Sequence, residues 1–150
     1  MEQPLVSVMM PVYNGIGSIE NSIKSLMLQT YQNWECIIVN DGSTDDTRFF
    51  LDSLLDERFV VHHFDLNKDF ASFKNNAKSY CTKDWVFQID ADETLSETFC
   101  TVIHQVLEAN EEIDLIAIPR VNIVNGLTKE DVIQWHWQLN NQGWVNWPDN

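Results

Sequence analysis

"DWVFQIDADETLSE", residues 84–97, begins as a short apolar run and ends in carboxylates. Its first part is typical of a buried β-strand, and Asp90 and Asp92 stand at the carboxyl end of that strand. Two carboxylates in this position are suited to a divalent cation and to the phosphates that the cation holds. Two chemistries fit the pair: a phosphatase with Asp90 as its nucleophile, or a transferase that binds a nucleotide diphosphate.

Strand and helix patterns alternate along the rest of the chain, and this alternation predicts an α/β fold around a mostly parallel sheet. Apolar runs rich in β-branched residues predict further strands over residues 5–13, 34–40 and 58–64, and a fifth strand or hairpin arm over residues 114–124. Helical periodicity predicts four helices between them: residues 17–30, a helix that carries Phe49, Phe50, Leu54 and Leu55, residues 69–81, and a helix that ends near Glu108.

Polar residues mark the expected starts of two of these helices. Ser43 is a predicted N-cap, and Asp45 and Asp46 would lie in the first turn after it, where the helix dipole favours anions. Thr94 and Glu97 have the spacing of a capping box for the last of the four helices.

Three polar segments follow predicted strands. They are "PVYNG" at residues 11–15, "NDGSTDD" at residues 40–46 and "DADE" at residues 90–93. The carboxyl ends of parallel strands lie along one edge of a sheet, and ligands of open α/β sheets bind beyond that edge. We therefore expect the three segments to converge on one site.

Composition narrows the classes of function. The chain has 150 residues and a formal net charge of −14, which disfavours binding to nucleic acid or to anionic lipid. Its length predicts one domain over residues 1–150. No apolar stretch has transmembrane length, and the start at residues 1–4 lacks a basic signal-peptide region. We expect a cytoplasmic protein, either free in the cytoplasm or peripheral at the inner face of the membrane. We also expect its three cysteines to be free thiols.

Five side chains carry the candidate chemistry, and each also has an ordinary structural interpretation. Asp90 and Asp92 would hold Mg²⁺ or Mn²⁺, or would only cap a helix. Asp41 would accept a hydrogen bond from a base or a ribose hydroxyl, or would only stabilise the turn Asp-Gly-Ser. Tyr13 would stack on a base or cover the end of a strand. Lys74 would pair with phosphate or remain a solvated residue of a helix.

Three blocks of the sequence carry a resemblance to a known family. They are "VSVMMPVYNG", "SIKSLMLQTYQNWECIIVNDGSTDDT" and "DFASFKNNAKSYCTKDWVFQIDADE", in this order and at family-like spacing. Together they resemble the family 2 glycosyltransferases over about residues 5–95, and within that family the bacterial sugar transferases of lipopolysaccharide-core and related cell-envelope type. Residues 116–149 are similar to the downstream part of that group, in a looser match.

The resemblance implies a GT-A fold, a Rossmann-like three-layer sandwich. It also implies a nucleotide-diphosphate sugar as donor, with a UDP-sugar expected, a divalent metal (Mn²⁺ or Mg²⁺), and inversion at the anomeric carbon by direct attack of a saccharide or lipid-linked saccharide acceptor. Carried over by position, Asp90 and Asp92 would hold the metal. The nucleotide site would comprise Pro11, Tyr13, Asn14, Asp41, Lys74, Asn75, Asp90 and Ala91.

The resemblance also has a departure. Members of the family usually exceed 200 residues, and their catalytic base follows the segment that resembles "WPDN", so we expect the base beyond Asn150 and assign no catalytic residue here. The predicted domain is then short at its C-terminal end. A catalytically silent nucleotide-sugar-binding module is the first alternative. A haloacid-dehalogenase-like phosphatase with Asp90 as nucleophile is the second, although Glu93 stands where that class has glycine.

Overall fold

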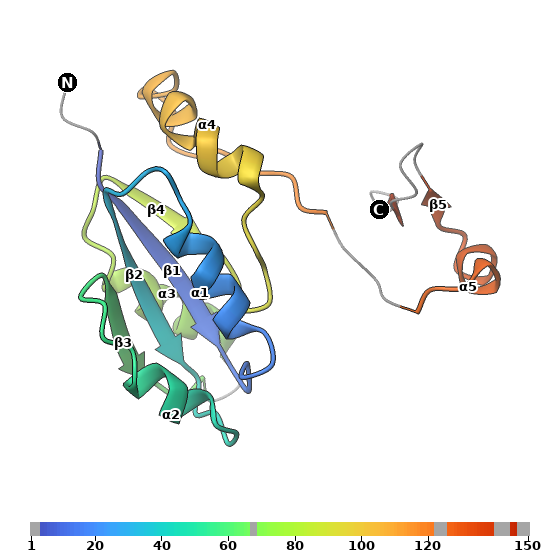
Figure 1. The fold of residues 1–150 in the computed structure, drawn as a ribbon, viewed down its shortest axis with the longest axis horizontal. Coiled ribbons are helices and arrows are strands. Elements are labelled where there is room, and N and C mark those ends of the chain that lie inside the picture. Colours follow the sequence, from blue (N-terminus) through green and yellow to red (C-terminus); the bar gives the residue numbers. More distant parts are fainter. Residues whose placement is uncertain (1–3, 67–68, 122–125, 140–144, 147–150) are drawn as a thin grey trace. The chain divides into compact units, whose positions relative to one another are not determined.

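The computed structural model describes residues 4–66, 69–121, 126–139 and 145–146. The chain separates into two compact units, Met1–Glu111 and Glu112–Asn150. The first unit contains a four-stranded sheet with helices around it (Figure 1). The prediction that residues 1–150 form one domain stays a prediction.

The sheet of the first unit is entirely parallel, as the sequence predicted. Its strands, in the order β3-β2-β1-β4, are β1 (Val6–Val12), β2 (Trp34–Asn40), β3 (Phe59–His63) and β4 (Trp85–Gln88). The central strands β1 and β2 are buried along nearly their whole length, which their continuous apolar runs require of a sheet covered on both faces.

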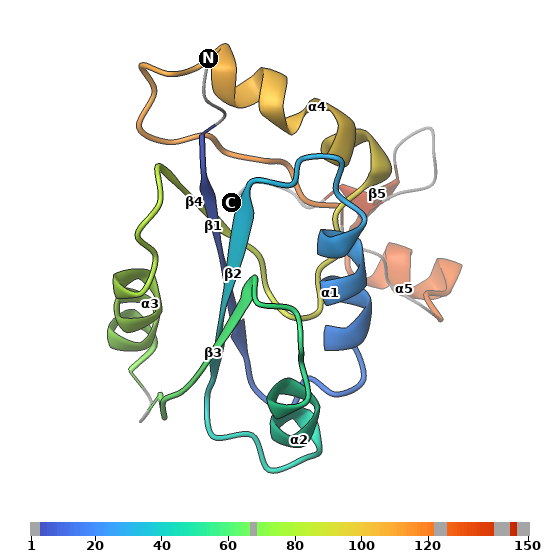
Figure 2. The same cartoon turned by 60° about the vertical axis from the view of Figure 1, so that its left-hand side comes forward.

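Helices cover both faces of this sheet. Helix α3 (Phe70–Ser79) lies on one face, and α1 (Ile19–Met27) and α2 (Thr47–Asp52) lie on the other (Figure 2). The chain passes from β3 through α3 to β4 on the far side of β1, so the strand order reverses beside β1. Such a reversal opens a crevice at the carboxyl edge of a parallel sheet.

Apolar contacts fix the helices to the sheet. Beneath α3, Phe73 and Ala77 pack with strand residues, in a cluster that comprises Met9, Ile37, Val39, Phe73 and Ala77. On the other face, the predicted apolar stripe of α1 is buried through Ile19, Ile23 and Leu26. Burial of each large apolar side chain contributes about 1.5–3 kcal/mol to the stability of the fold. The three cysteines are free, as expected.

A fourth helix, α4 (Glu97–Glu108), is fastened to the end of α1 by polar contacts. The hydroxyl of Thr30 donates to the carbonyl of Cys100 at 2.8 Å, and the backbone N–H of Leu95 donates to Ser25 Oγ at 3.2 Å. These contacts fix the path of the chain as it leaves the carboxyl edge after β4.

Two predicted helix starts are wrong. Ser96, and not Thr94, is the N-cap of α4, because its hydroxyl accepts the N–H of Phe99 at 3.1 Å. Helix α2 begins at Thr47, so Asp45 and Asp46 precede the helix and Ser43 does not cap it. In both regions several neighbouring Ser, Thr and Asp residues compete for one cap position, and their order in the sequence does not rank them.

Two further predictions also require correction. Helix α2 ends at Asp52, so Leu54 and Leu55 lie outside it, and Leu55 is 95% exposed. The expected strand over residues 114–124 is not formed by residues 114–121, and residues 122–124 lie outside the described residues. Leu115 is 82% exposed, so the apolar side chains of this segment do not form the buried face of a strand.

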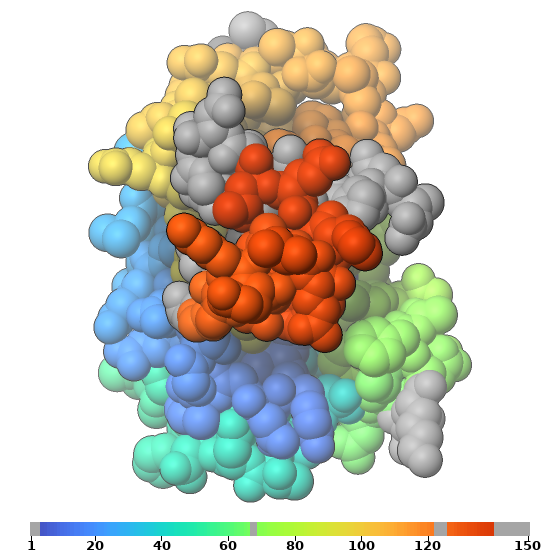
Figure 3. All heavy atoms as spheres, turned by 90° about the vertical axis from the view of Figure 1, so that its right-hand side faces the viewer, coloured from blue at the N-terminus to red at the C-terminus, as the bar shows by residue number. Residues whose placement is uncertain are grey.

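The second unit contains helix α5 (Lys129–Gln134) and two short antiparallel strands, β5 (Gln138–Leu139) and β6 (Val145–Asn146). A capping box between Thr128 and Asp131 starts α5. The described side chains of residues 126–139 form a compact group in the space-filling view (Figure 3). None of the helices in the described part of the chain has the length and apolar character needed to cross a bilayer.

Candidate functional site

The loops after β1 and β2 are joined at the carboxyl edge of the sheet. The backbone N–H of Asn14 donates to Ser43 Oγ at 2.9 Å, and the N–H of Thr44 donates to Asn14 Oδ1 at 2.8 Å. The N–H of Asp41 donates to the carbonyl of Val12 at 2.9 Å. The two loops therefore form one hydrogen-bonded surface.

The loop after β4 reaches the same edge. Ser22 Oγ in α1 donates to the carbonyl of Ala91 at 2.9 Å. A Cβ at Gly15 would lie 3.7 Å from Ala91 Cβ, an ordinary van der Waals distance, so the loops after β1 and β4 lie side by side. The same Cβ would lie 2.5 Å from Val12 Cγ2, so glycine is required at this position. The predicted convergence of the three loop segments is therefore confirmed.

Lys74 and Asp90 form an ion pair at this edge. Lys74 Nζ, from α3, lies 3.1 Å from Asp90 Oδ1, and both side chains keep part of their surface in solvent. A tight turn follows, in which the N–H of Asp90 donates to Glu93 Oε2 at 2.9 Å and the N–H of Glu93 donates back to the Asp90 carbonyl at 3.0 Å. The sequence had not indicated this positioning role of Glu93.

Asp92 is exposed and lies two residues after Asp90, with the buried Ala91 between them. Among the described residues, no group of three or more His, Cys, Asp and Glu side chains is placed to hold a metal by itself. Two neighbouring carboxylates still suit Mg²⁺ or Mn²⁺, because these hard cations often take one or two protein carboxylates and complete their shell with phosphate and water oxygens. The donor set fits a cation that arrives with a diphosphate.

The other predicted site residues differ in how accessible they are. Tyr13 is 61% exposed and its ring is free to stack on a ligand, and Asn75 is also exposed. Pro11 and Asp41 are half-buried, and Ala91 is buried. One oxygen of the Asp41 carboxylate already accepts the N–H of Leu66, so Asp41 also holds the chain that leads from β3 to α3.

The sequence did not indicate the structural role of three polar residues at the edge, which are Asn40, Ser43 and His63. Asn40, at the end of β2, is buried at 1% exposure. Its Oδ1 accepts from Ser43 N at 3.2 Å and from Ser43 Oγ at 2.5 Å, and its Nδ2 lies 3.1 Å from His63 Nδ1. The available signal was an amide side chain that directly follows the apolar residues 36–39 of β2.

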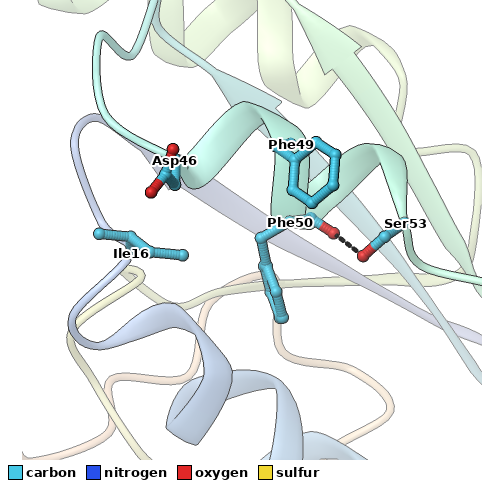
Figure 4. A pocket seen from close by; sticks show the side chains of 5 residues that line it. All are labelled: Ile16, Asp46, Phe49, Phe50 and Ser53. Atoms are coloured by element: carbon cyan, nitrogen blue, oxygen red, sulfur yellow. Dashed lines mark hydrogen bonds between the residues drawn. The ribbon is translucent and has the colours of Figure 1, made fainter.

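Two cavities lie near the loop after β2. One of about 570 Å³ is lined by Asn40, Gly42, Ser43, Arg48, His63, Phe64 and Asp65. The other, of about 520 Å³, lies between Ile16 and α2, where Phe49, Phe50 and Ser53 line it together with Asp46 (Figure 4). Neither cavity includes the Lys74–Asp90 pair, so we take the exposed carboxyl edge, and not these cavities, as the candidate site.

Comparison with known protein families gives a match over nearly the whole chain. The model of the family "Glycosyl transferase family 2" matches residues 7–148.

Comparison with curated proteins gives relatives of the same kind. The chain is 36% identical over 93 residues to an Escherichia coli UDP-Glc:alpha-D-GlcNAc-diphosphoundecaprenol beta-1,3-glucosyltransferase, which covers 62% of this chain and 37% of the relative. It is 29% identical over 109 residues to a glycosyltransferase of Streptococcus pneumoniae, which covers 71% of this chain and 36% of that one. The chain thus spans little more than a third of the length of these relatives.

Solved structures share the fold. Staphylococcus aureus TarS, residues 1–349, in complex with UDP-GlcNAc superposes with a TM-score of 0.65 at 18% identity, over 78% of this chain and 37% of that chain. A Pyrobaculum calidifontis mannosyltransferase in complex with GDP-Man and Mn²⁺ superposes with a TM-score of 0.58 at 24% identity, over 69% and 32% of the two chains. The predicted GT-A fold is confirmed.

Proposed function

The chain belongs to glycosyl transferase family 2, and from this premise we propose that its carboxyl edge binds a nucleotide-diphosphate sugar for transfer to an acceptor hydroxyl. The observation that carries the proposal is the Lys74–Asp90 ion pair at the carboxyl edge of the sheet. The exposed Asp92 lies two residues after Asp90, and the exposed Tyr13 follows β1 at the same edge. One cationic group and two carboxylates at the crevice of a parallel sheet suit a diphosphate and its counter-cation.

The nucleoside would occupy the part of the edge formed by the loops after β1 and β2. Tyr13 offers an exposed aromatic side chain to a base, and the half-buried Pro11, two residues earlier, adds apolar surface to this segment. Asp41 keeps carboxylate acceptor capacity beyond its bond to Leu66, which suits a base N–H or a ribose hydroxyl. Asn14 and Ala91 border this site through the loops that they occupy.

The diphosphate would lie near Lys74 and Asn75, where α3 reaches the edge. Asp90 and Asp92 would hold a divalent cation, Mn²⁺ or Mg²⁺, which as a Lewis acid would neutralise charge on the departing diphosphate. The formal net charge of −14 makes such a counter-charge necessary, because the protein as a whole repels an anionic donor. Lys74 supplies a point charge and lacks the planar fork of arginine.

Transfer with inversion would proceed by direct attack of the acceptor hydroxyl on the anomeric carbon. The acceptor would be a saccharide or a lipid-linked saccharide, which the diphosphoundecaprenol-linked substrate in the E. coli relative's name supports. A lipid-linked acceptor would bring the protein to the inner face of the membrane as a peripheral protein. A carboxylate base would deprotonate the hydroxyl, and we assign no residue of this chain to that role.

The test is an assay of donor binding and donor cleavage. The full chain is titrated with UDP-glucose, UDP-GlcNAc and GDP-mannose, with Mn²⁺ and with chelator, and free nucleoside diphosphate is measured in parallel. We expect metal-dependent binding of at least one donor. A failure of every donor to bind, or binding that is the same in chelator, would contradict the proposal.

The silent binding module is the second candidate, and one observation favours it. The chain spans little more than a third of the relatives above, and no catalytic base is assigned within it. Binding of donor with no release of nucleoside diphosphate in the presence of acceptors supports the silent module, whereas release supports transfer. The phosphatase alternative is dropped because the chain belongs to a different family, and hydrolysis of p-nitrophenyl phosphate would reinstate it.

A further inference from the structure

A buried amide at the end of β2 is bonded on both of its sides. Asn40 is 1% exposed and follows an otherwise apolar run of strand residues. Its Oδ1 accepts two hydrogen bonds from Ser43, one from the backbone N at 3.2 Å and one from Oγ at 2.5 Å. A buried amide needs such partners, because an amide group that is removed from water without a hydrogen bond lowers the stability of the fold.

The next link leads to the loop after β1. Ser43 Oγ, which donates to Asn40, accepts the backbone N–H of Asn14 at 2.9 Å. Asn14 has φ of 49°, a left-handed conformation that few non-glycine residues adopt without support from their surroundings. Asn14 Oδ1 in turn accepts the N–H of Thr44 at 2.8 Å. Asn14 stands next to Tyr13, so the link ends at the proposed nucleoside site.

The orientation of the Asn40 amide follows from its partners. The Ser43 backbone N–H can only donate, so the carbonyl oxygen of Asn40 faces it and the NH₂ group faces His63. His63 Nδ1 must then accept, and its Nε2 carries the hydrogen toward Asp52 Oδ1 at 3.2 Å. Arg48 Nε lies 3.7 Å from the other oxygen of Asp52. The amide is therefore held in one orientation from both sides.

We propose that Asn40 is a positioning residue for nucleotide binding, which sets the backbone of Asn14 through Ser43 without touching the ligand. The inference rests on the proposed function, since it concerns the same site. Asn40 is only 1% exposed and so offers a ligand almost no surface, and an apolar side chain of similar size would fill the same place in the core without needing hydrogen-bond partners. Its polar atoms already bond to Ser43 and His63. Through Ser43, Asn40 is connected to the loop after β1, which would face the nucleoside.

Three variants test the proposal by calorimetry with UDP and Mn²⁺, each well below its own thermal midpoint. Asn40→Leu removes the acceptor for Ser43, and we expect it to weaken UDP binding about tenfold. Asn40→Asp keeps an acceptor for Ser43 and should retain most of the affinity. Ser53→Ala, which removes a hydroxyl that donates to the Phe50 carbonyl outside this link, is the matched control and should bind as the parent does.

Non-additivity is the readout that a merely structural role would not give. Ser43→Ala should weaken UDP binding as Asn40→Leu does, and the double variant should bind no more weakly than either single variant. If the two losses add, or if Asn40→Leu and Asn40→Asp bind equally well, the proposal is overturned.

Hydrogen exchange separates this proposal from the proposed function. The amide of Asn14 should exchange about tenfold faster in Asn40→Leu and in Ser43→Ala than in Asn40→Asp, whether or not nucleotide binds. A parent chain that binds no nucleotide would contradict the proposed function alone, and the exchange rates would still decide whether Asn40 holds Asn14. Equal exchange in all three variants would overturn the positioning role.

Discussion

Lys74 Nζ lies 3.1 Å from Asp90 Oδ1, and this ion pair joins α3 to the loop after β4. The two side chains are 27% and 43% exposed, so solvent screens the pair and its contribution to stability is at most about 1 kcal/mol. Its value lies in position, because it holds a cationic group and a carboxylate together at the crevice before any ligand arrives.

Replacement of Lys74 by methionine should separate binding from stability. We expect Lys74→Met to weaken UDP binding about tenfold, because the charge that faces the diphosphate is lost, while the free energy of unfolding changes by about 1 kcal/mol or less. Calorimetry and urea denaturation measure the two quantities. Lys24→Met removes an exposed partner of Glu20 and serves as the control. Equal affinities of the two variants would remove Lys74 from the site.

Asp92 should be responsible for the effect of metal on nucleotide affinity. In the parent chain Mn²⁺ should raise the affinity for UDP, and in Asp92→Asn that gain should disappear, because a neutral amide is a weak ligand for a hard cation. UDP titrations with Mn²⁺ and with chelator measure the gain. Glu57→Gln makes the same change of net charge at an exposed position and should leave the gain intact. A gain that persists in Asp92→Asn would assign the metal to other groups.

Asp41 has a structural bond as well as a proposed ligand, and two substitutions distinguish them. Asp41→Asn can still accept the Leu66 N–H but presents NH₂ to the ligand, so we expect about tenfold weaker UDP binding at nearly unchanged stability. Asp41→Ala also loses the Leu66 bond and should cost about 1–3 kcal/mol of unfolding free energy. If Asp41→Asn binds UDP as tightly as the parent does, Asp41 acts only as a residue of the turn.

Gly42 is required by the backbone after β2. Its φ is +58°, and an added Cβ would lie 2.6 Å from Asp65 Oδ1, so Gly42→Ala should lower the free energy of unfolding by about 1–2 kcal/mol. Gly17 has no positive φ and no atom within 4 Å of an added Cβ, so Gly17→Ala should be neutral or stabilise by up to about 1 kcal/mol. Urea denaturation of both variants gives the comparison, and equal losses would contradict this account.

Asp69 should make α3 sensitive to acid. Hydrogen bonds from the Ser72 backbone N–H, and then from its hydroxyl, lower the pKa of the Asp69 carboxyl below its ordinary value. The ionised cap therefore stabilises the fold fully above that ordinary value, and the contribution is lost as the pH falls through the lowered pKa. Asp69→Asn still caps but does not titrate, so its thermal midpoint should fall less between pH 5 and about pH 2.5. An unchanged acid profile would contradict the role of Asp69.

The sheet could be predicted from the sequence because each of its strands has a recognisable local pattern of apolar residues. Residues 34–40 form the predicted strand without any shift, since the apolar run at residues 36–39 suits a strand buried on both faces. The expected strand at residues 114–124 failed at residues 114–121, because a similar run there does not become buried. Apolar composition therefore indicates a strand only where the rest of the chain provides a partner and cover.

The candidate site could be predicted only in part, because some of its residues depend on partners that are distant in the sequence. Asp90 and Asp92 could be identified because they lie together at the end of a strand. The role of Asn40 depends on the bond between Ser43 and Asn14, which are 29 residues apart, and that of Lys74 on Asp90, 16 residues away. Such pairings follow from the register of the sheet and from the placement of α3, which the sequence pattern does not specify.

The position of β1 between β2 and β4 also bears on how the first unit reaches its native state. The N–H of Leu5, just before β1, donates to the Asp84 carboxylate across a sequence separation of 79 residues, and the β1–β4 ladder begins beside that bond. Closing so long a loop is entropically costly, so non-local pairing of this kind makes folding slow. During synthesis the edge of β1 that pairs with β4 would stay unpaired until β4 has left the ribosome. A chaperone that shields this edge would raise the yield of folded protein.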